Sequence, residues 1–255
     1  MCLILVAWHA HHEFPLVVAA NRDEFHARAT APAAFWADHP QVLAGRDLAA
    51  GGTWLGFTCD GRLAALTNFR DPARHQPYAP SRGRLVADFL CGETGIDAYL
   101  DSLDSGRYNG FNLLLGDGRR LVAFSNVTGE RHELAPGIYG LSNALLDTPW
   151  PKVGAGKAAL EAALHHLPDE HGLWALLCDD RTHPDHLLPA TGVPREWERL
   201  LSAAFIRGVD YGTRSSTVIT LSAGGKVTFD EQTWLPGGMA GERRRYRYSL
   251  ISTGV

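Results

Sequence analysis

The residue types that could do chemistry gather near the start of the chain, where Cys2 precedes an apolar run from Leu3 to Trp8. A run of this length predicts a buried strand. If Met1 is removed, as is usual when the second residue is small, Cys2 carries both a thiol and a free α-amine. That amine, with an ordinary pKa of about 7.7–8.0, can accept the thiol proton near neutral pH, as in enzymes with a terminal threonine nucleophile. A small buried cysteine near a chain end is the competing interpretation, and both stay open on this observation alone.

Four polar residues, Asn21, Arg22, Asp23 and Glu24, end the next apolar run. The two runs are joined by a short polar loop, which predicts an antiparallel hairpin. A turn centred near residues 11 and 12 would place Cys2 opposite Asn21, to within about two residues. Arg22 could then stabilise a thiolate, because a neighbouring cation lowers a cysteine pKa, and Asp23 could pair with the amine. A charged strand end is the alternative, but the hairpin arithmetic favours a functional role.

Composition narrows the class of protein. A chain of 255 residues, with 45% hydrophobic and 20% charged residues, supports one large or two small domains and a sizeable core. We expect one domain over residues 1–255. The formal net charge of -4 gives no electrostatic reason to expect nucleic acid as a partner. The four cysteines are scattered and form no CxxC pair, which favours reduced thiols. We expect no transmembrane segment and no signal peptide, and therefore a cytoplasmic protein. No feature of the sequence specifies an oligomeric state.

Apolar runs and turn signals predict about ten strands and several helices. The strands are expected at 1–8, 15–20, 51–57, 62–69, 111–115, 121–124, in a pair that brackets Pro136-Gly137 and ends at 138–143, and at 217–221, 226–229 and 246–250. The helices are expected at 83–103, split near its glycines, and at 150–167, 173–177 and 194–205, with 25–50 irregular and 70–83 a loop. Strands and helices that come in separate blocks favour an α+β fold with two stacked, mainly antiparallel sheets covered by helices.

Asn68 and Asn143 each fall at the end of a predicted strand, where a side-chain amide could reach a cleft. An asparagine that merely closes a strand into a turn accounts for Asn68 equally well. Three histidines in the first hairpin loop could bind a metal, although solvated histidines are the favoured interpretation and we expect no metal site. They are His9, His11 and His12.

Several of these motifs together resemble the NRDE family, also called the transport and Golgi organisation protein 2 family, over the length of the chain. They are Cys2, Asn21-Arg22-Asp23-Glu24, Gly51-Gly52-Thr53-Trp54-Leu55-Gly56, Thr67-Asn68, Ser142-Asn143 and Gly212-Thr213-Arg214-Ser215-Ser216. More distantly, the arrangement is similar to the cysteine N-terminal-nucleophile (Ntn) hydrolases of the choloylglycine hydrolase and penicillin V acylase type. The resemblance implies a four-layer αββα fold.

The resemblance also implies roles for single residues. Cys2 would be the nucleophile with its amine as base, Arg22 and Asp23 its neighbours, Asn68 and Asn143 the oxyanion-binding or amine-orienting residues, and Arg214 the arginine late in the chain. Arg22 and Asp23 are adjacent here, whereas the hydrolases separate them by a few residues. Adjacent strand residues point to opposite faces, so both side chains can reach the thiol only if the strand has ended before them. This affects the role implied for Asp23 more than that of Arg22.

Two functions follow as expectations. The first is a cysteine amidohydrolase that transfers an acyl group from a small-molecule amide or thioester to water and requires no cofactor. The alternative is a non-catalytic protein on a hydrolase-like fold that binds and moves haem, an acyl lipid or acyl-CoA. Fold alone does not separate the two.

Overall fold

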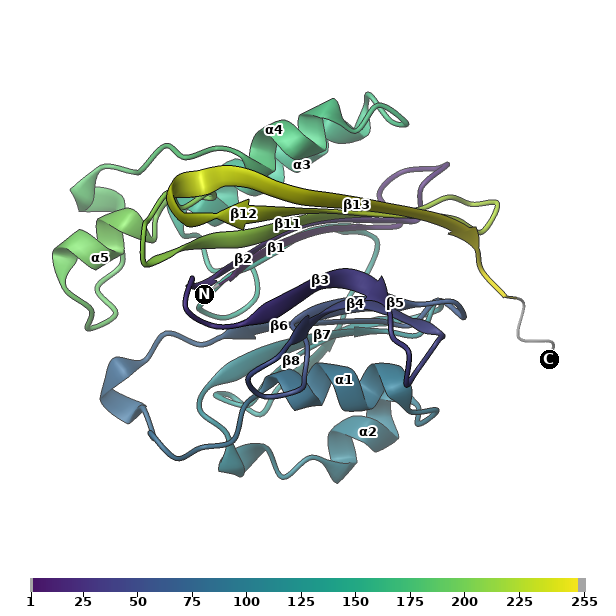
Figure 1. Cartoon of the computed structure of the whole chain (residues 1–255), viewed down its shortest axis with the longest axis horizontal. Helices are drawn as coiled ribbons and strands as arrows, with labels where there is room; N and C mark the ends of the chain where they lie inside the picture. Colours follow the sequence, from purple (N-terminus) through teal and green to yellow (C-terminus); the bar gives the residue numbers. More distant parts are fainter. Residues whose placement is uncertain (1, 252–255) are drawn as a thin grey trace.

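Two antiparallel sheets stack face to face in the computed structural model, which describes residues 2–251 (Figure 1). The six-stranded sheet contains, in spatial order, β10 (Gly137–Leu141), β1 (Cys2–Trp8), β2 (Leu16–Phe25), β11 (Tyr211–Leu221), β12 (Lys226–Leu235) and β13 (Met239–Ser249). The seven-stranded sheet contains β3 (Thr30–Phe35), β4 (Val42–Asp47), β5 (Leu55–Thr58), β6 (Leu63–Asn68), β7 (Phe111–Gly116), β8 (Leu121–Ser125) and β9 (Arg131–Glu133).

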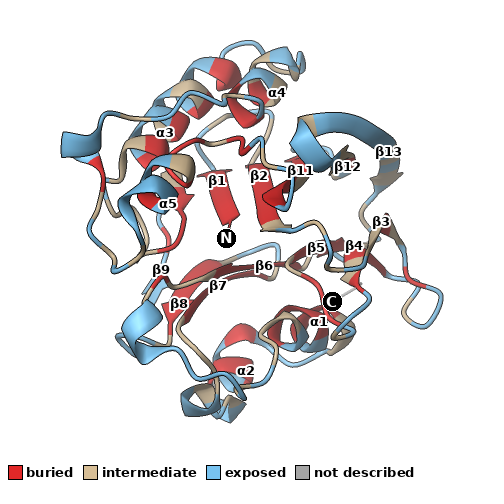
Figure 2. Cartoon of the chain, turned by 60° about the vertical axis from the view of Figure 1, so that its left-hand side comes forward, coloured by how far each residue is buried: buried red, intermediate tan, exposed pale blue. Residues whose placement is uncertain are grey.

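Helices cover the outer side of each sheet (Figure 1). On the seven-stranded sheet lie α1 (Gly83–Cys91) and α2 (Ile96–Ser102), and on the six-stranded side lie α3 (Pro151–Leu164), α4 (His171–Leu177) and α5 (Arg195–Leu200). The strands are mostly buried, while the helices expose their outer sides (Figure 2). The predicted four-layer αββα architecture and α+β class are therefore confirmed.

The side chains of β1 alternate between two cores. Ile4 and Val6 pack between the sheets, whereas Leu3 and Leu5 pack under α3 and α4. This period of two is the geometry of any strand. Cys2 has the same parity as Ile4, so its side chain belongs to the space between the sheets.

The first hairpin forms, but with its register one residue away from the prediction. Cys2 pairs with Arg22, and Leu3 pairs with Asn21. A shift of one residue reverses which side chains share a face. The observed register therefore puts Arg22, instead of Asn21, on the same face as Cys2.

Other segments also differ from expectation. The stretch 25–50, expected to be irregular, contributes β3 and β4, whose pairing is interrupted between Ala31 and Ala34. Pro32 sits at this irregularity, which is where an edge strand tolerates proline. The strands around Pro136 belong to different sheets, since β9 pairs with β8 and β10 pairs with β1. Within residues 2–251, no helix is long and apolar enough to span a bilayer.

Candidate active site around Cys2

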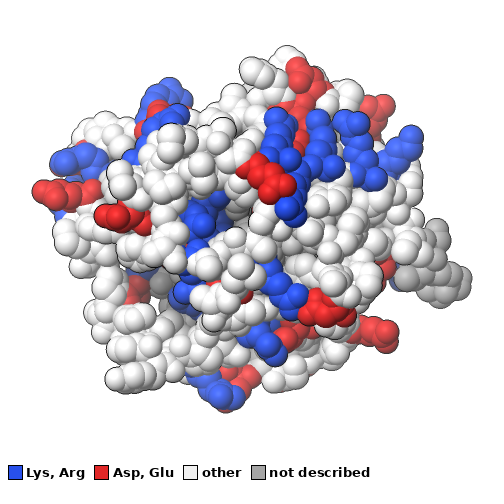
Figure 3. Space-filling model, viewed as in Figure 1, with Lys and Arg blue, Asp and Glu red and all other residues white. Residues whose placement is uncertain are grey.

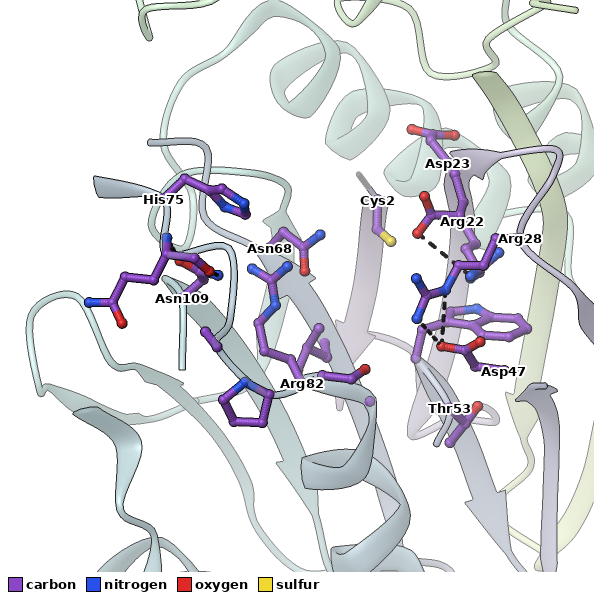
Figure 4. Close-up of a pocket in the computed structure, with 18 of the residues that line it drawn as sticks. Cys2, Arg22, Asp23, Arg28, Asp47, Thr53, Asn68, His75, Arg82 and Asn109 are labelled. Carbon is purple, nitrogen blue, oxygen red and sulfur yellow. Dashed lines mark hydrogen bonds and ion pairs between the residues drawn. The ribbon is translucent and has the colours of Figure 1, made fainter. Parts of the chain in front are cut away.

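A pocket of about 280 Å³ opens at one end of the sheet stack, where β1, β2 and β6 meet the segment that leads into α1. Cys2, Arg22 and Asn68 line it, as do Arg82 and His75 from that segment (Figure 4). With Asp23, four of the six sequence-predicted site residues therefore line one cavity, although they come from three separate strands.

Cys2 is buried at the wall of this pocket. Its backbone carbonyl accepts a hydrogen bond from Ser142 Oγ at 3.0 Å, which fixes the strand end. Burial raises the pKa of the thiol, while the chain's α-amino group, the nearby Arg22 cation and a hydrogen bond from the Asp23 backbone oppose that effect. The resting side chain is therefore a thiol that needs a base before it can attack.

Arg22 lines the pocket, and part of its guanidinium has no hydrogen-bond partner among residues 2–251. Its side chain lies over the Trp54 ring, with Cζ 4.7 Å from the ring centroid, a cation–π contact. Its Nη2 atom is 3.7 Å from Glu24 Oε2. Nη1 is buried and makes no hydrogen bond within residues 2–251. A buried donor without a partner is costly, so a ligand oxygen or a water molecule is its natural complement.

Asp23 lies on the helix-facing side of β2, as its adjacency to Arg22 indicated. Thr213 Oγ1 donates to its carboxylate at 2.8 Å, and Figure 4 shows this carboxylate turned away from the arginine side chains. Burial raises the Asp23 pKa, and the Lys152 ammonium lowers it. Asp23 thus borders the pocket from behind the strand.

The two predicted asparagines differ in placement. Asn68 ends β6 and lines the pocket. Asn143 lies two residues beyond β10 and is buried; its Nδ2 donates to the Asn68 backbone oxygen at 2.8 Å, and its Oδ1 accepts from Ser142 Oγ at 3.3 Å. Asn143 is not among the residues that line this pocket, so the structure places it as a support behind Asn68.

Arg214 is also outside the pocket lining. It sits where the β2–β11 pairing is irregular, and its Nη1 donates to the backbone oxygens of Phe25 and Arg28, both at 2.9 Å. These hydrogen bonds fix the position of the backbone where it leaves β2. The structure does not bring Arg214 to Cys2 as part of the cavity wall.

Sequence reasoning missed three basic residues near Cys2. Arg28 lines the pocket and pairs with Asp47 at 2.6 Å. Arg82 stands on the opposite wall (Figure 4), where its Nη1 donates to Gly110 O at 3.0 Å. Lys152 is buried in the first turn of α3. No pattern in the loop sequence identifies Arg82. The spacing of Lys152 from two later buried positions of the same helix, in contrast, indicates that the lysine itself is buried. Those positions are Gly156 and Leu160.

Comparison with known proteins establishes the family. The sequence profile described as Transport and Golgi organisation 2 matches residues 1–236. The chain belongs to this family. It is 41% identical over 262 residues to the Transport and Golgi organization protein 2 homolog of Bos taurus, covering 92% of this chain and 94% of the bovine protein. It is 36% identical over 279 residues to the Homo sapiens homolog, covering 99% and 100%.

Among solved structures, this Transport and Golgi organisation 2 family member is similar to a Caenorhabditis elegans N-acylethanolamine-hydrolyzing acid amidase ortholog. The TM-score is 0.53 at 12% sequence identity, and the match covers 86% of this chain and 92% of the amidase. At this identity the likeness shows a shared fold alone. The family resemblance predicted from the motifs is thus confirmed, while the chemistry must be argued from the site.

Proposed function

We propose that this protein is an N-terminal-cysteine amidohydrolase that transfers an acyl group from an amide or thioester to water. One observation carries the proposal: Cys2 and Arg22 are directly opposed on the same face of a hairpin, at the wall of a cavity that can admit a ligand. A cysteine in a sealed core or an arginine on the other face would have left no site for acyl transfer.

The reaction requires Cys2 to be the first residue of the mature chain. Its α-amine takes the proton of the thiol, and Sγ attacks the substrate carbonyl carbon. The C–N or C–S bond then breaks, the ammonium proton passes to the leaving group, and a thioester to Cys2 remains. Water, deprotonated by the same amine, hydrolyses this thioester and regenerates the thiol. The raised thiol pKa supports a mechanism that depends on a base.

Donors for the oxyanion are available on the pocket wall. The Asn68 side chain and the Arg82 guanidinium both line the cavity opposite Cys2 (Figure 4). Removing one such donor costs hydrolases about 10²–10³ in rate. Arg28 pairs closely with Asp47 at 2.6 Å, whereas Arg22 is 3.7 Å from Glu24. Arg22 and Arg82 are therefore the cations best placed for a negative group elsewhere on the substrate.

The second candidate function is binding of an anionic acyl lipid or acyl-CoA without hydrolysis. It is favoured by the Arg22 and Arg82 guanidinium groups of the pocket wall together with a thiol that burial keeps protonated. Haem as a passenger stays a prediction. A cytoplasmic location remains part of the proposal, and the free state of all four cysteines is compatible with a reducing compartment.

Turnover of a panel of N-acyl amides and acyl thioesters by pure protein separates the two functions. Intact mass spectrometry first establishes whether Cys2 is the terminus. We expect hydrolysis by the wild type and by the control Cys178→Ala, whose cysteine is exposed, and its loss in Cys2→Ala. Turnover that survives Cys2→Ala excludes the amidohydrolase. Saturable binding without turnover in the wild type supports the second function.

A further inference from the structure

Lys152 is a buried cation on the helix side of the candidate site. Only 3% of its surface is exposed, and its Nζ makes no hydrogen bond within residues 2–251. A buried ammonium is costly unless an opposite charge compensates it. We therefore expect a nearby anion that compensates the charge of Lys152.

The fold supplies an anion on the same side of the sheet. Lys152 lies in the first turn of α3, which packs on β1 and β10. Asp23 points to this helix-facing side of β2, where Thr213 binds one carboxylate oxygen. After burial, Lys152 has the strongest influence on the pKa of Asp23, which it lowers. Asp23 in turn is the main group that opposes the effect of burial on Lys152.

We propose that Lys152 is a positioning residue for the Cys2 site, whose ammonium keeps the Asp23 carboxylate ionised so that this carboxylate can orient the amine of Cys2. The inference rests on the proposed function, because it gives the amine a catalytic task. It adds a residue from α3 to a site otherwise built from the sheets and the loop before α1.

Two further charges close to Lys152 already balance each other. Arg70 Nη1 and Glu198 Oε2, which both act on Lys152, form their own buried ion pair at 2.6 Å. Burial lowers the Lys152 pKa to about 8, so the side chain is mostly protonated at pH 7. The groups that face Asp23 or Lys152 are Cys2 on β1, Arg22 on β2, Arg70 after β6, Glu198 on α5, Tyr211 and Thr213 on β11, and the chain's α-amino group.

The test measures the pH dependence of Cys2 alkylation by iodoacetamide, followed on the Cys2 peptide by mass spectrometry. Without the Lys152 ammonium the buried Asp23 carboxylate takes up a proton, and the loss of that anion lowers the thiol pKa. Lys152→Met should therefore speed alkylation at pH 7.5, by up to roughly tenfold per pKa unit, whereas Lys152→Arg should keep the wild-type rate. Asp23→Asn removes an anion and should speed alkylation. Lys157→Met is the matched control, because Lys157 lies on the same helix and pairs with Asp147 at 2.8 Å.

An alkylation profile of Lys152→Met identical to that of the wild type overturns the proposal. If Lys152→Met does not fold, the double variant Asp23→Asn/Lys152→Met, which leaves no uncompensated carboxylate, is compared with Asp23→Asn. Because Lys152 acts through Asp23, the two rates should be equal, and a further change in the double variant overturns the proposal. With an active substrate, the acid limb of the pH–rate profile should move to higher pH in Lys152→Met and return in Lys152→Arg, which a loss of packing would not do. Absence of hydrolysis in the wild type defeats the proposed function alone, since alkylation needs no substrate.

Discussion

Glu231 is a buried acid between the sheets, and its replacement by glutamine offers the sharpest test of the electrostatics. Only 2% of the residue is exposed. Its Oε1 accepts a hydrogen bond from the Ala33 backbone N–H at 2.6 Å, and Thr217 Oγ1 donates to Oε2 at 3.5 Å. Burial raises the pKa of Glu231 to about 7, although these hydrogen bonds and the nearby Arg22 oppose that effect. Glutamine keeps an acceptor for Ala33 and carries no charge.

The magnitude follows from the pKa of about 7 against the ordinary value of 4.5. At about 1.4 kcal/mol per pKa unit, this difference corresponds to about 3 kcal/mol of unfolding free energy. Between these two pKa values the folded protein binds the Glu231 proton more tightly than the unfolded chain does. Stability from this group is therefore full below pH 4.5 and is lost as the pH rises through 7. Glu231→Gln removes that loss.

The assay is urea unfolding of the wild type and Glu231→Gln at several pH values from 5 to 8.5. The free-energy difference between the two proteins should change by up to about 3 kcal/mol in favour of Glu231→Gln as the pH rises. Comparing the two proteins cancels the other titrating groups. Glu161→Gln, at an exposed position of α3, is the control and should give parallel curves. Parallel curves for Glu231→Gln would refute the assignment of a buried, proton-binding carboxylate.

Three further substitutions test the surroundings of the site. Arg22→Met should slow Cys2 alkylation near pH 7.5, because Arg22 lowers the thiol pKa; an unchanged rate would argue against their electrostatic contact. Arg70→Met leaves the buried Glu198 without its cation, and the free energy of unfolding measured in urea should fall by about 3–5 kcal/mol. The double variant Arg70→Met/Glu198→Met should recover much of this loss. A fall of less than about 1 kcal/mol in Arg70→Met would contradict the buried ion pair. Ser142→Ala removes the hydrogen bond to the Cys2 carbonyl and should lower the free energy of unfolding by about 1 kcal/mol. Thermal unfolding measures this change. An unchanged melting temperature would show that the hydrogen bond does not contribute to stability.

The local sequence pattern was sufficient to predict the hairpin at the centre of the site, but not the exact register of its two strands. The two apolar runs and the loop between them predicted the hairpin, and the adjacency of Arg22 and Asp23 predicted that they would occupy opposite faces. The partner of Cys2 was wrong by one residue, because turn geometry, which sets register, cannot be read from loop composition. That single residue decides whether an amide or a guanidinium stands on the face of the thiol.

The remaining residues could not be predicted because their roles depend on contacts distant in sequence. Arg82 reaches the pocket because the segment before α1 crosses the open end of the sheets, and no periodic pattern encodes that path. Asn143 was predicted from its place at a strand end and from the family resemblance, and Arg214 from the resemblance alone. Neither signal gives the direction of a side chain, and here the two bind the backbones of Asn68 and of the chain leaving β2. Lys152 differs, because an unpaired lysine in the buried phase of a helix requires a compensating anion wherever the helix packs. A lysine at a buried helix position is therefore a sequence feature that can identify a residue packed behind the wall of a site.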